Sequence, residues 1–150
     1  KDNHLYHKSK KIKFKYHLHE DGLITRPKFN IEKIKGFEYD VEFEVSKEFI
    51  ANILKLSSNI DANKLYLYTE DGNLCWDIKD ETQPNTDNLC LTIEDVDLDL
   101  EKFIISLDNI RMMSFSDLTL FRLNTKLGIA SIKSSFPSFQ IEYVSTSLTK

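Results

Sequence analysis

A chain of 150 residues, 41% of them apolar and 29% charged, is long enough to bury a core and has the composition of a water-soluble domain. It contains no run of about eighteen apolar residues that could cross a bilayer, and we recognise no secretory leader, so we expect a cytoplasmic protein without a membrane partner. The net charge of −4 argues against a generally basic nucleic-acid-binding domain. The charge is uneven, however: residues 1–36 carry ten Lys or Arg against four acids, and residues 37–150 carry ten against twenty.

The first 36 residues differ from the rest in pattern as well as in charge. Residues 10–19 alternate polar and apolar side chains, which predicts a strand with one lysine-rich face. Lysine on such a face also protects an edge strand from unwanted pairing. Residues 20–22 form a turn signal, and residues 23–36 contain Pro27 without sustained periodicity, so we expect an extended linker there.

A first structural unit is predicted from Phe37 onward. Apolar and acidic residues alternate over 37–45, and helical spacing follows from Ser46 to about Ser58. The Asp71-Gly72 pair lies between two alternating runs and predicts a hairpin. The three strands expected after the helix are Lys64–Tyr68, Leu74–Lys79 and Asn88–Ile93.

A second unit repeats the same order sixty residues later. An apolar strand ends at Ile105, and a short helix begins at Ser106 and runs to about Met113. The three strands expected after it are Leu118–Leu123, Leu127–Lys133 and Phe139–Val144. The sequence therefore predicts an α+β fold of two β-α-β-β-β units, with antiparallel sheets and both helices on one face.

Helical geometry divides each predicted helix into two faces. The inward face of the first helix is apolar, while Lys55 and Asn59 lie on its outward face. In the second helix Asp108 and Arg111 lie outward. The outward face would offer Lys55 and Arg111 to a polyanion.

Several residues that carry chemistry elsewhere have simpler interpretations here. Ser46 and Ser106 are interpreted as helix N-caps and not nucleophiles, since no histidine lies near either in sequence. Cys75 and Cys90 are predicted to be buried thiols on neighbouring strands. We expect no metal and no cofactor: the acidic stretch 94–101 lacks the spacing of a calcium loop. The four histidines match no zinc motif and are interpreted as surface residues; they are His4, His7, His17 and His19.

The stretch from Phe103 to Met112, with its apolar-x-Asn-apolar-basic-Met run, resembles the last helix of the DNA sliding clamps, and most closely the processivity clamps of T-even-type tailed phages. The first helix, with Ile53-Leu54-Lys55-Leu56-Ser57, is similar in the same way. The resemblance covers roughly residues 11–145. It implies a ring of domains with helices lining the hole and sheets forming the rim.

On this resemblance residues 37–150 would form a C-terminal clamp domain, and residues 1–36 the last strand of a preceding clamp domain plus the interdomain connector. The protein would be a non-enzymatic processivity factor that encircles duplex DNA as a homotrimer, with a DNA polymerase and a clamp loader as partners, in the cytoplasm of an infected host cell. The resemblance implies DNA contacts from Lys55, Arg111 and Asn59. It implies a groove for partner peptides at Leu23, Ile24, Phe29 and Ile31. The alternative is a non-enzymatic β-rich module of a phage or virus that binds a protein or a ligand.

Overall fold

The computed structural model describes residues 4–8, 13–17, 36–79 and 88–148. The chain divides into two compact units, Lys1–Gly36 and Phe37–Lys150. In the first unit, β1 (His4–Lys8) pairs antiparallel with β2 (Lys13–His17). The strand predicted over 10–19 contains β2, whereas β1 was not predicted.

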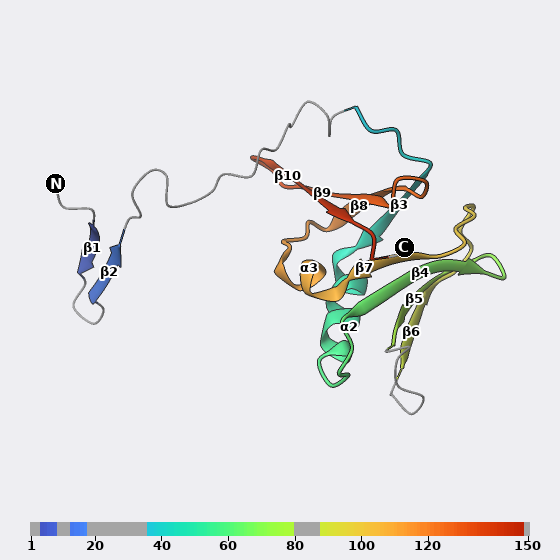
Figure 1. Cartoon of the computed structure of the whole chain (residues 1–150), viewed down its shortest axis with the longest axis horizontal. Coiled ribbons are helices and arrows are strands. Elements are labelled where there is room, and N and C mark those ends of the chain that lie inside the picture. Colours follow the sequence, from blue (N-terminus) through green and yellow to red (C-terminus); the bar gives the residue numbers. More distant parts are fainter. Residues whose placement is uncertain (1–3, 9–12, 18–35, 80–87, 149–150) are drawn as a thin grey trace. The chain divides into compact units, whose positions relative to one another are not determined.

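The second unit contains the two predicted β-α-β-β-β segments in order (Figure 1). The first segment is β3 (Val41–Ser46), α2 (Lys47–Ser57), β4 (Lys64–Glu70), β5 (Asn73–Ile78) and β6 (Leu89–Ile93). The second is β7 (Phe103–Ser106), α3 (Leu107–Met112), β8 (Leu118–Asn124), β9 (Ile129–Ser135) and β10 (Gln140–Thr146).

The two segments exchange their first strands. The strand order is β10-β9-β8-β3 in one four-stranded sheet and β6-β5-β4-β7 in the other, with every pairing antiparallel. Strand β3 of the first segment therefore pairs with β8 of the second, and β7 of the second pairs with β4 of the first. This exchange makes the repeat a single domain, because neither segment completes a sheet alone.

Both helices bury one apolar side against a core that the two sheets share. Ile50 and Ile53 of α2 and Leu107 and Ile110 of α3 are almost fully buried. Trp76 of β5 lies at the centre, since its ring contacts aromatic rings of both the other sheet and α2. Its centroid distances are 6.4 Å to Phe43, 5.2 Å to Phe121 and 5.4 Å to Phe49.

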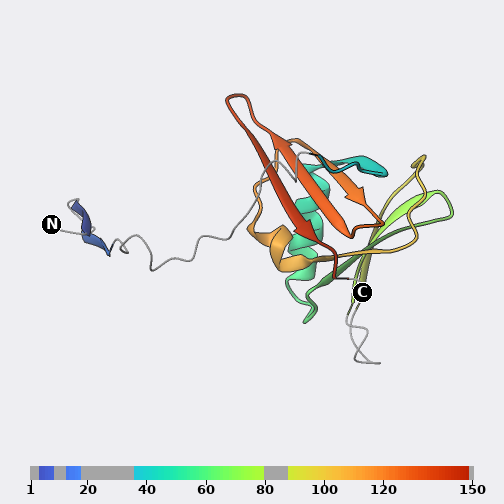
Figure 2. The same cartoon turned by 45° about the horizontal axis from the view of Figure 1, so that its top comes forward.

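The helices lie side by side in both ribbon views (Figures 1 and 2), which places their outward surfaces on one face of the domain. The predicted fold class is confirmed. The outward side of each helix is exposed, as the exposed side chains of Lys55 and Arg111 show.

Turn chemistry explains where the strands begin and end. Asp71 and Gly72 have φ angles of 51° and 77°, as a two-residue type I′ hairpin between β4 and β5 requires. Strand β9 begins two residues later than predicted because Gly128, with φ 64°, completes the preceding turn. Strand β3 begins at Val41 and not at Phe37, although the Asp40 amide already donates to the Leu123 carbonyl at 2.9 Å.

Candidate nucleic-acid interface

The outward surface of α2 follows from how this helix begins and ends. Ser46 caps it: its hydroxyl oxygen accepts a hydrogen bond from the Phe49 amide at 3.2 Å. Ser58 follows the last helical residue as the C-cap, and its amide and hydroxyl both donate to the Lys55 carbonyl. Lys55 and Asn59 are exposed at this end. A cation in the last turn is favourable because the helix dipole is negative there.

The start of α3 uses a different cap from the predicted one. Ser106 occupies the N-cap position but makes no side-chain capping hydrogen bond, so this part of the prediction is wrong. Asn63, from the loop between α2 and β4, takes its place. The side-chain oxygen of Asn63 accepts a hydrogen bond from the Asp108 backbone amide at 3.0 Å. The backbone carbonyl of Asn63 accepts one from the Leu107 amide at 2.9 Å. The loop after α2 thus fixes the first turn of α3.

Arg111 is exposed as predicted, but it is paired. Its Nη1 atom donates to the Asp108 carboxylate at 2.9 Å, and the two side chains keep 38% and 57% of their surface exposed. Lys55 makes no ion pair with any of the residues that the structure describes. The two predicted cations therefore differ, since the charge of only one is compensated by a neighbour.

The charge of the outward helix surface is small. The two helices carry three cations, Lys47, Lys55 and Arg111, and two carboxylates, Glu48 and Asp108, all of them exposed. A polyanion approaching this surface would meet a net charge of only about one. The surface suits weak, sequence-independent attraction better than tight binding.

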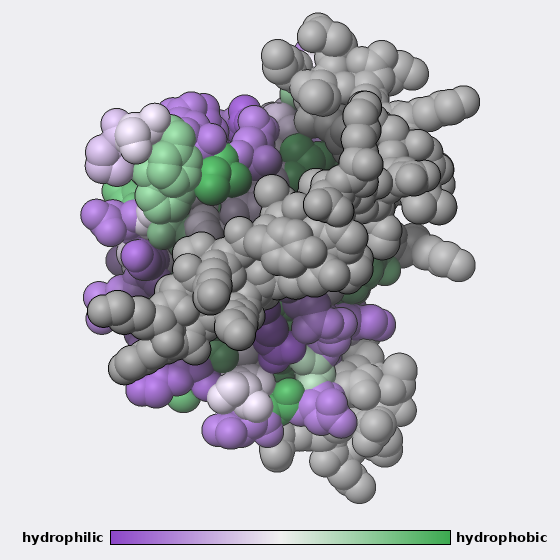
Figure 3. All heavy atoms as spheres, turned by 90° about the vertical axis from the view of Figure 1, so that its left-hand side faces the viewer, coloured by the Kyte–Doolittle hydropathy of each residue, from purple (hydrophilic) through white to green (hydrophobic). Residues whose placement is uncertain are grey.

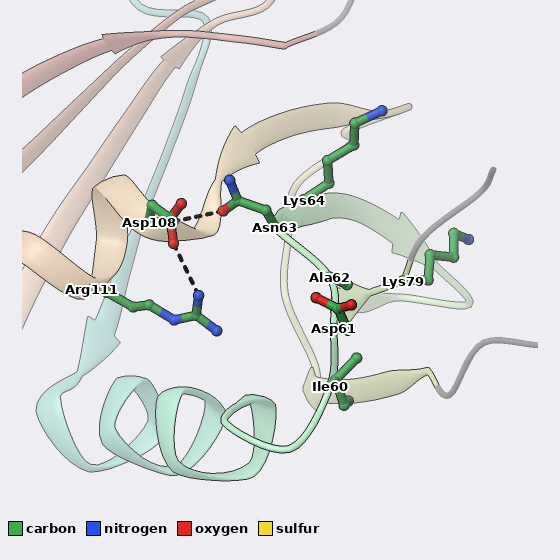
Figure 4. A pocket seen from close by; sticks show the side chains of 8 residues that line it. All are labelled: Ile60, Asp61, Ala62, Asn63, Lys64, Lys79, Asp108 and Arg111. Atoms are coloured by element: carbon green, nitrogen blue, oxygen red, sulfur yellow. Dashed lines mark hydrogen bonds and ion pairs between the residues drawn. The ribbon is translucent and has the colours of Figure 1, made fainter. Parts of the chain in front are cut away.

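Arg111 and Asp108 border a pocket of about 480 Å³ at the end of the domain where α2 turns into β4. Figure 4 shows the Arg111 guanidinium directed toward the loop at residues 60–63, with Asp108 and Asn63 beside it. Lys64 and Lys79 line the same pocket, but their side chains extend away from Arg111. The cations do not converge, so this pocket is not a preformed site for a compact anion.

The predicted peptide groove lies outside the described residues. Leu23, Ile24, Phe29 and Ile31 all fall within 18–35. Another apolar surface is described at the β10 edge, where Met112, Met113, Tyr143 and Val144 line a pocket of about 440 Å³. Met112 is 77% exposed, which is unusual for a large apolar side chain. Figure 3 shows a face whose described part is mostly hydrophilic, with scattered apolar residues.

The two cysteines lie on the paired strands β5 and β6, as predicted, and neither forms a disulfide. Cys75 is buried but Cys90 is exposed, so the prediction of two buried thiols is wrong for Cys90. Partial burial, followed by the nearby Cys75 and Asp77, raises the pKa of Cys90. Burial, followed by the nearby Cys90, Asp77 and Cys75, raises the pKa of Tyr68 to about 12. Because a protonated thiol is a poor nucleophile, Cys90 has low intrinsic reactivity at neutral pH.

Among the described residues there is no group of three or more His, Cys, Asp or Glu side chains placed to hold a metal ion. No described helix is both long and apolar enough to cross a membrane.

The fold is one that known proteins share. Two four-stranded antiparallel sheets with a pair of helices on one face are the architecture of a DNA sliding-clamp domain, and solved structures similar to this chain are clamps.

One is the Helicobacter pylori beta clamp in complex with 5-chloroisatin, with a TM-score of 0.63 and 19% identity over 92% of this chain and 39% of the clamp. Another is the H. pylori beta clamp bound to a DNA ligase peptide, with a TM-score of 0.57 and 22% identity over 81% of this chain and 33% of the clamp. A putative DNA polymerase III beta subunit from Eubacterium rectale matches 99% of this chain and 40% of its own, with a TM-score of 0.58 and 14% identity.

This chain thus spans two fifths or less of the length of these clamps. No protein-family model and no curated protein sequence matches it. The identities are low enough that the similarity establishes the fold alone.

Proposed function

We propose that this chain is the C-terminal domain of a DNA sliding clamp, a non-enzymatic processivity factor that encircles duplex DNA and tethers a DNA polymerase. One observation carries the proposal: the two strand-exchanged sheets leave α2 and α3 together on one surface, in the architecture of the beta clamps. In a ring of such domains this surface would face the hole.

The charge of the helix surface supports contact with DNA through phosphates and not through bases. A ring retains DNA by enclosing it, so its inner wall needs only enough attraction to offset desolvation while the duplex slides. Lys55 and Arg111 would supply charge, and the exposed amide of Asn59 would donate to phosphate oxygens. The acidic remainder of the domain would cost little, because fields are screened beyond about 8 Å at physiological salt.

Self-assembly is supported at the free edge of β10. This strand has a hydrogen-bonded neighbour on one side only, among the described residues, and the apolar pocket at Met112 and Tyr143 lies beside it. An edge strand next to exposed apolar side chains is a ready interface for another chain. We propose a head-to-tail homotrimer, in which two different edges meet and the rotation closes the ring.

Residues 1–36 are proposed to be the last strand of a preceding clamp domain followed by the interdomain connector. The break between the two compact units at Gly36 is compatible with this division. The connector residues Leu23, Ile24, Phe29 and Ile31 would border a groove for peptides of the polymerase and the clamp loader. The H. pylori clamp that holds a DNA ligase peptide is a precedent for such docking on this fold.

A phage origin, with action in the cytoplasm of the infected cell, remains part of the proposal through the T-even-like pattern at Phe103–Met112.

The proposal is tested by the mass and the activity of the full-length protein. Sedimentation equilibrium should give three times the subunit mass, and primer extension by a partner polymerase with its clamp loader should yield longer products when the protein is added. A protein that stayed monomeric at all accessible concentrations and left product length unchanged would instead be a β-rich binding module.

A further inference from the structure

Asp108 is an unexpected residue on a surface proposed to attract DNA. It is 57% exposed, and its carboxylate lies 2.9 Å from the guanidinium of Arg111, one of only three cations on the two helices. We infer that Asp108 attenuates the attraction of this surface for duplex DNA by holding Arg111 in a neutral pair. The inference rests on the proposed function.

The structure fixes the Asp108 backbone from a neighbouring element. The Asn63 side chain accepts a hydrogen bond from the Asp108 backbone amide at 3.0 Å, and the Asn63 backbone carbonyl accepts one from the Leu107 amide at 2.9 Å. Because Ser106 does not cap this helix, these two bonds hold its first turn. Figure 4 shows the Asp108 carboxylate directed toward the Arg111 guanidinium, with which it pairs.

The pair is weak enough for DNA to compete with it. Exposed ion pairs contribute little to stability, because water and salt screen them. Arg111 uses one nitrogen on Asp108, and a guanidinium has five N–H donors, so phosphate can bind without the pair fully separating. Asp108 would stay beside the phosphate, however, and would cancel much of the attraction.

Attenuation suits an enclosing ring. A wall with strong point attractions would slow sliding, whereas a nearly neutral wall lets the duplex move between equivalent phosphate positions. Lys55 would then supply the uncompensated charge and Arg111 a hydrogen-bonding group with little net charge.

The test uses the full-length protein and a fluorescent linear duplex, with affinity measured by anisotropy from about 50 to 200 mM salt. Asp108→Asn keeps the side-chain shape and should bind about two- to fivefold tighter at the low-salt end, the effect of removing one carboxylate close to a phosphate in water. The slope of log affinity against log salt should become steeper by up to about 0.9, one more neutralised phosphate. Asp108→Glu restores the charge and should restore wild-type binding.

Asp61→Asn is the matched control. Asp61 is exposed and lines the same pocket as Asp108 and Arg111, but Arg111 forms its ion pair with Asp108 and not with Asp61. It removes the same charge and should change affinity less than Asp108→Asn. In an Arg111→Gln background the gain from Asp108→Asn should fall to that of the control. An equal gain with and without Arg111, or equal effects of Asp61→Asn and Asp108→Asn, would overturn the inference while leaving DNA binding in place. Absence of binding to the linear duplex by every variant, together with no retention on loaded nicked circular DNA, would overturn the proposed function, and the inference with it.

Discussion

Lys55→Gln should weaken the salt dependence of DNA binding without unfolding the protein. Lys55 is exposed in the last turn of α2 and has no ion-pair partner among the described residues, whereas Arg111 is paired with Asp108. Lys47 lies eight residues earlier on the same helix, about 12 Å away along the axis, which is beyond the screening length at physiological salt. Lys55 is thus the main uncompensated charge at the end of the surface that carries Arg111.

The size of the effect follows from counterion release. Each neutralised phosphate contributes a slope of about −0.9 in log affinity against log salt, so a fourfold rise in salt costs about 3.5-fold in affinity per phosphate. The Lys55→Gln curve should be less steep by about 0.9, and the two proteins should converge in affinity as salt is raised.

Fluorescence anisotropy with a linear duplex across this salt range measures both slopes. Lys133→Gln is the control, because Lys133 lies on β9 between the core-facing Ile132 and Ser134 and so points to the opposite side of the sheet. The unfolding temperature should fall only slightly, since a cation at a helix C-terminus contributes about 0.5 kcal/mol. Equal slopes for wild type, Lys55→Gln and Lys133→Gln would refute the assignment of the helix surface to DNA.

Three further results are expected. Ser46→Ala should lower the free energy of unfolding by about 1 kcal/mol, and Ser106→Ala by much less, when both are measured by urea denaturation; equal losses would contradict the observed difference in capping. Burial alone would raise the pKa of Asp40, but hydrogen bonds from the Thr125 side chain and amide outweigh it and lower the pKa overall. Asp40 therefore stabilises the fold above its unfolded pKa of about 3.9. The difference in free energy of unfolding between wild type and Asp40→Asn should be constant near neutrality and should shrink as pH falls through the folded pKa of Asp40. A difference that persists in acid would argue against this. Alkylation of Cys90 by iodoacetamide should keep accelerating above pH 9, since its pKa is raised from 9.0, whereas a rate that levels off near pH 8 would contradict the raised pKa.

Local pattern predicted the elements well because each carries its own signal. The alternation before Ser46, the helical spacing after it and the Asp71-Gly72 turn are short-range properties, and the structure confirms the strand, the helix and the hairpin. The errors at strand ends arise where a turn residue such as Gly128 decides the boundary.

Long-range pairing could not be predicted in the same way. Nothing in β3 indicates that its partner is β8, about eighty residues later, and not β4, because hydrophobic alternation is the same for either neighbour. The Asn63 cap has the same origin: Asn63 lies 45 residues before Asp108, and only the folded chain brings them together.

The exposure of the two candidate cations was predicted, whereas their role in DNA binding stays a prediction. Amphipathic spacing placed Lys55 and Arg111 on the exposed helix surface, where both are found. The spacing of Asp108 and Arg111, three residues apart on a helix, was a visible signal for the ion pair. Cys75 is buried and Cys90 is exposed because β5 lies inside its sheet and β6 lies at the edge. The position of a strand within a sheet is not encoded in its local sequence.

The central claim is that a ring of these domains encloses DNA. Comparing its retention on circular and on linear DNA tests this claim most directly. The full-length protein, assembled on nicked circular plasmid with its clamp loader, should remain bound through gel filtration at a salt concentration that disrupts ordinary electrostatic binding. Cutting the plasmid once should release it, because a ring slides off a free end. Equal retention on circular and linear DNA, or loss from both at moderate salt, would contradict the account.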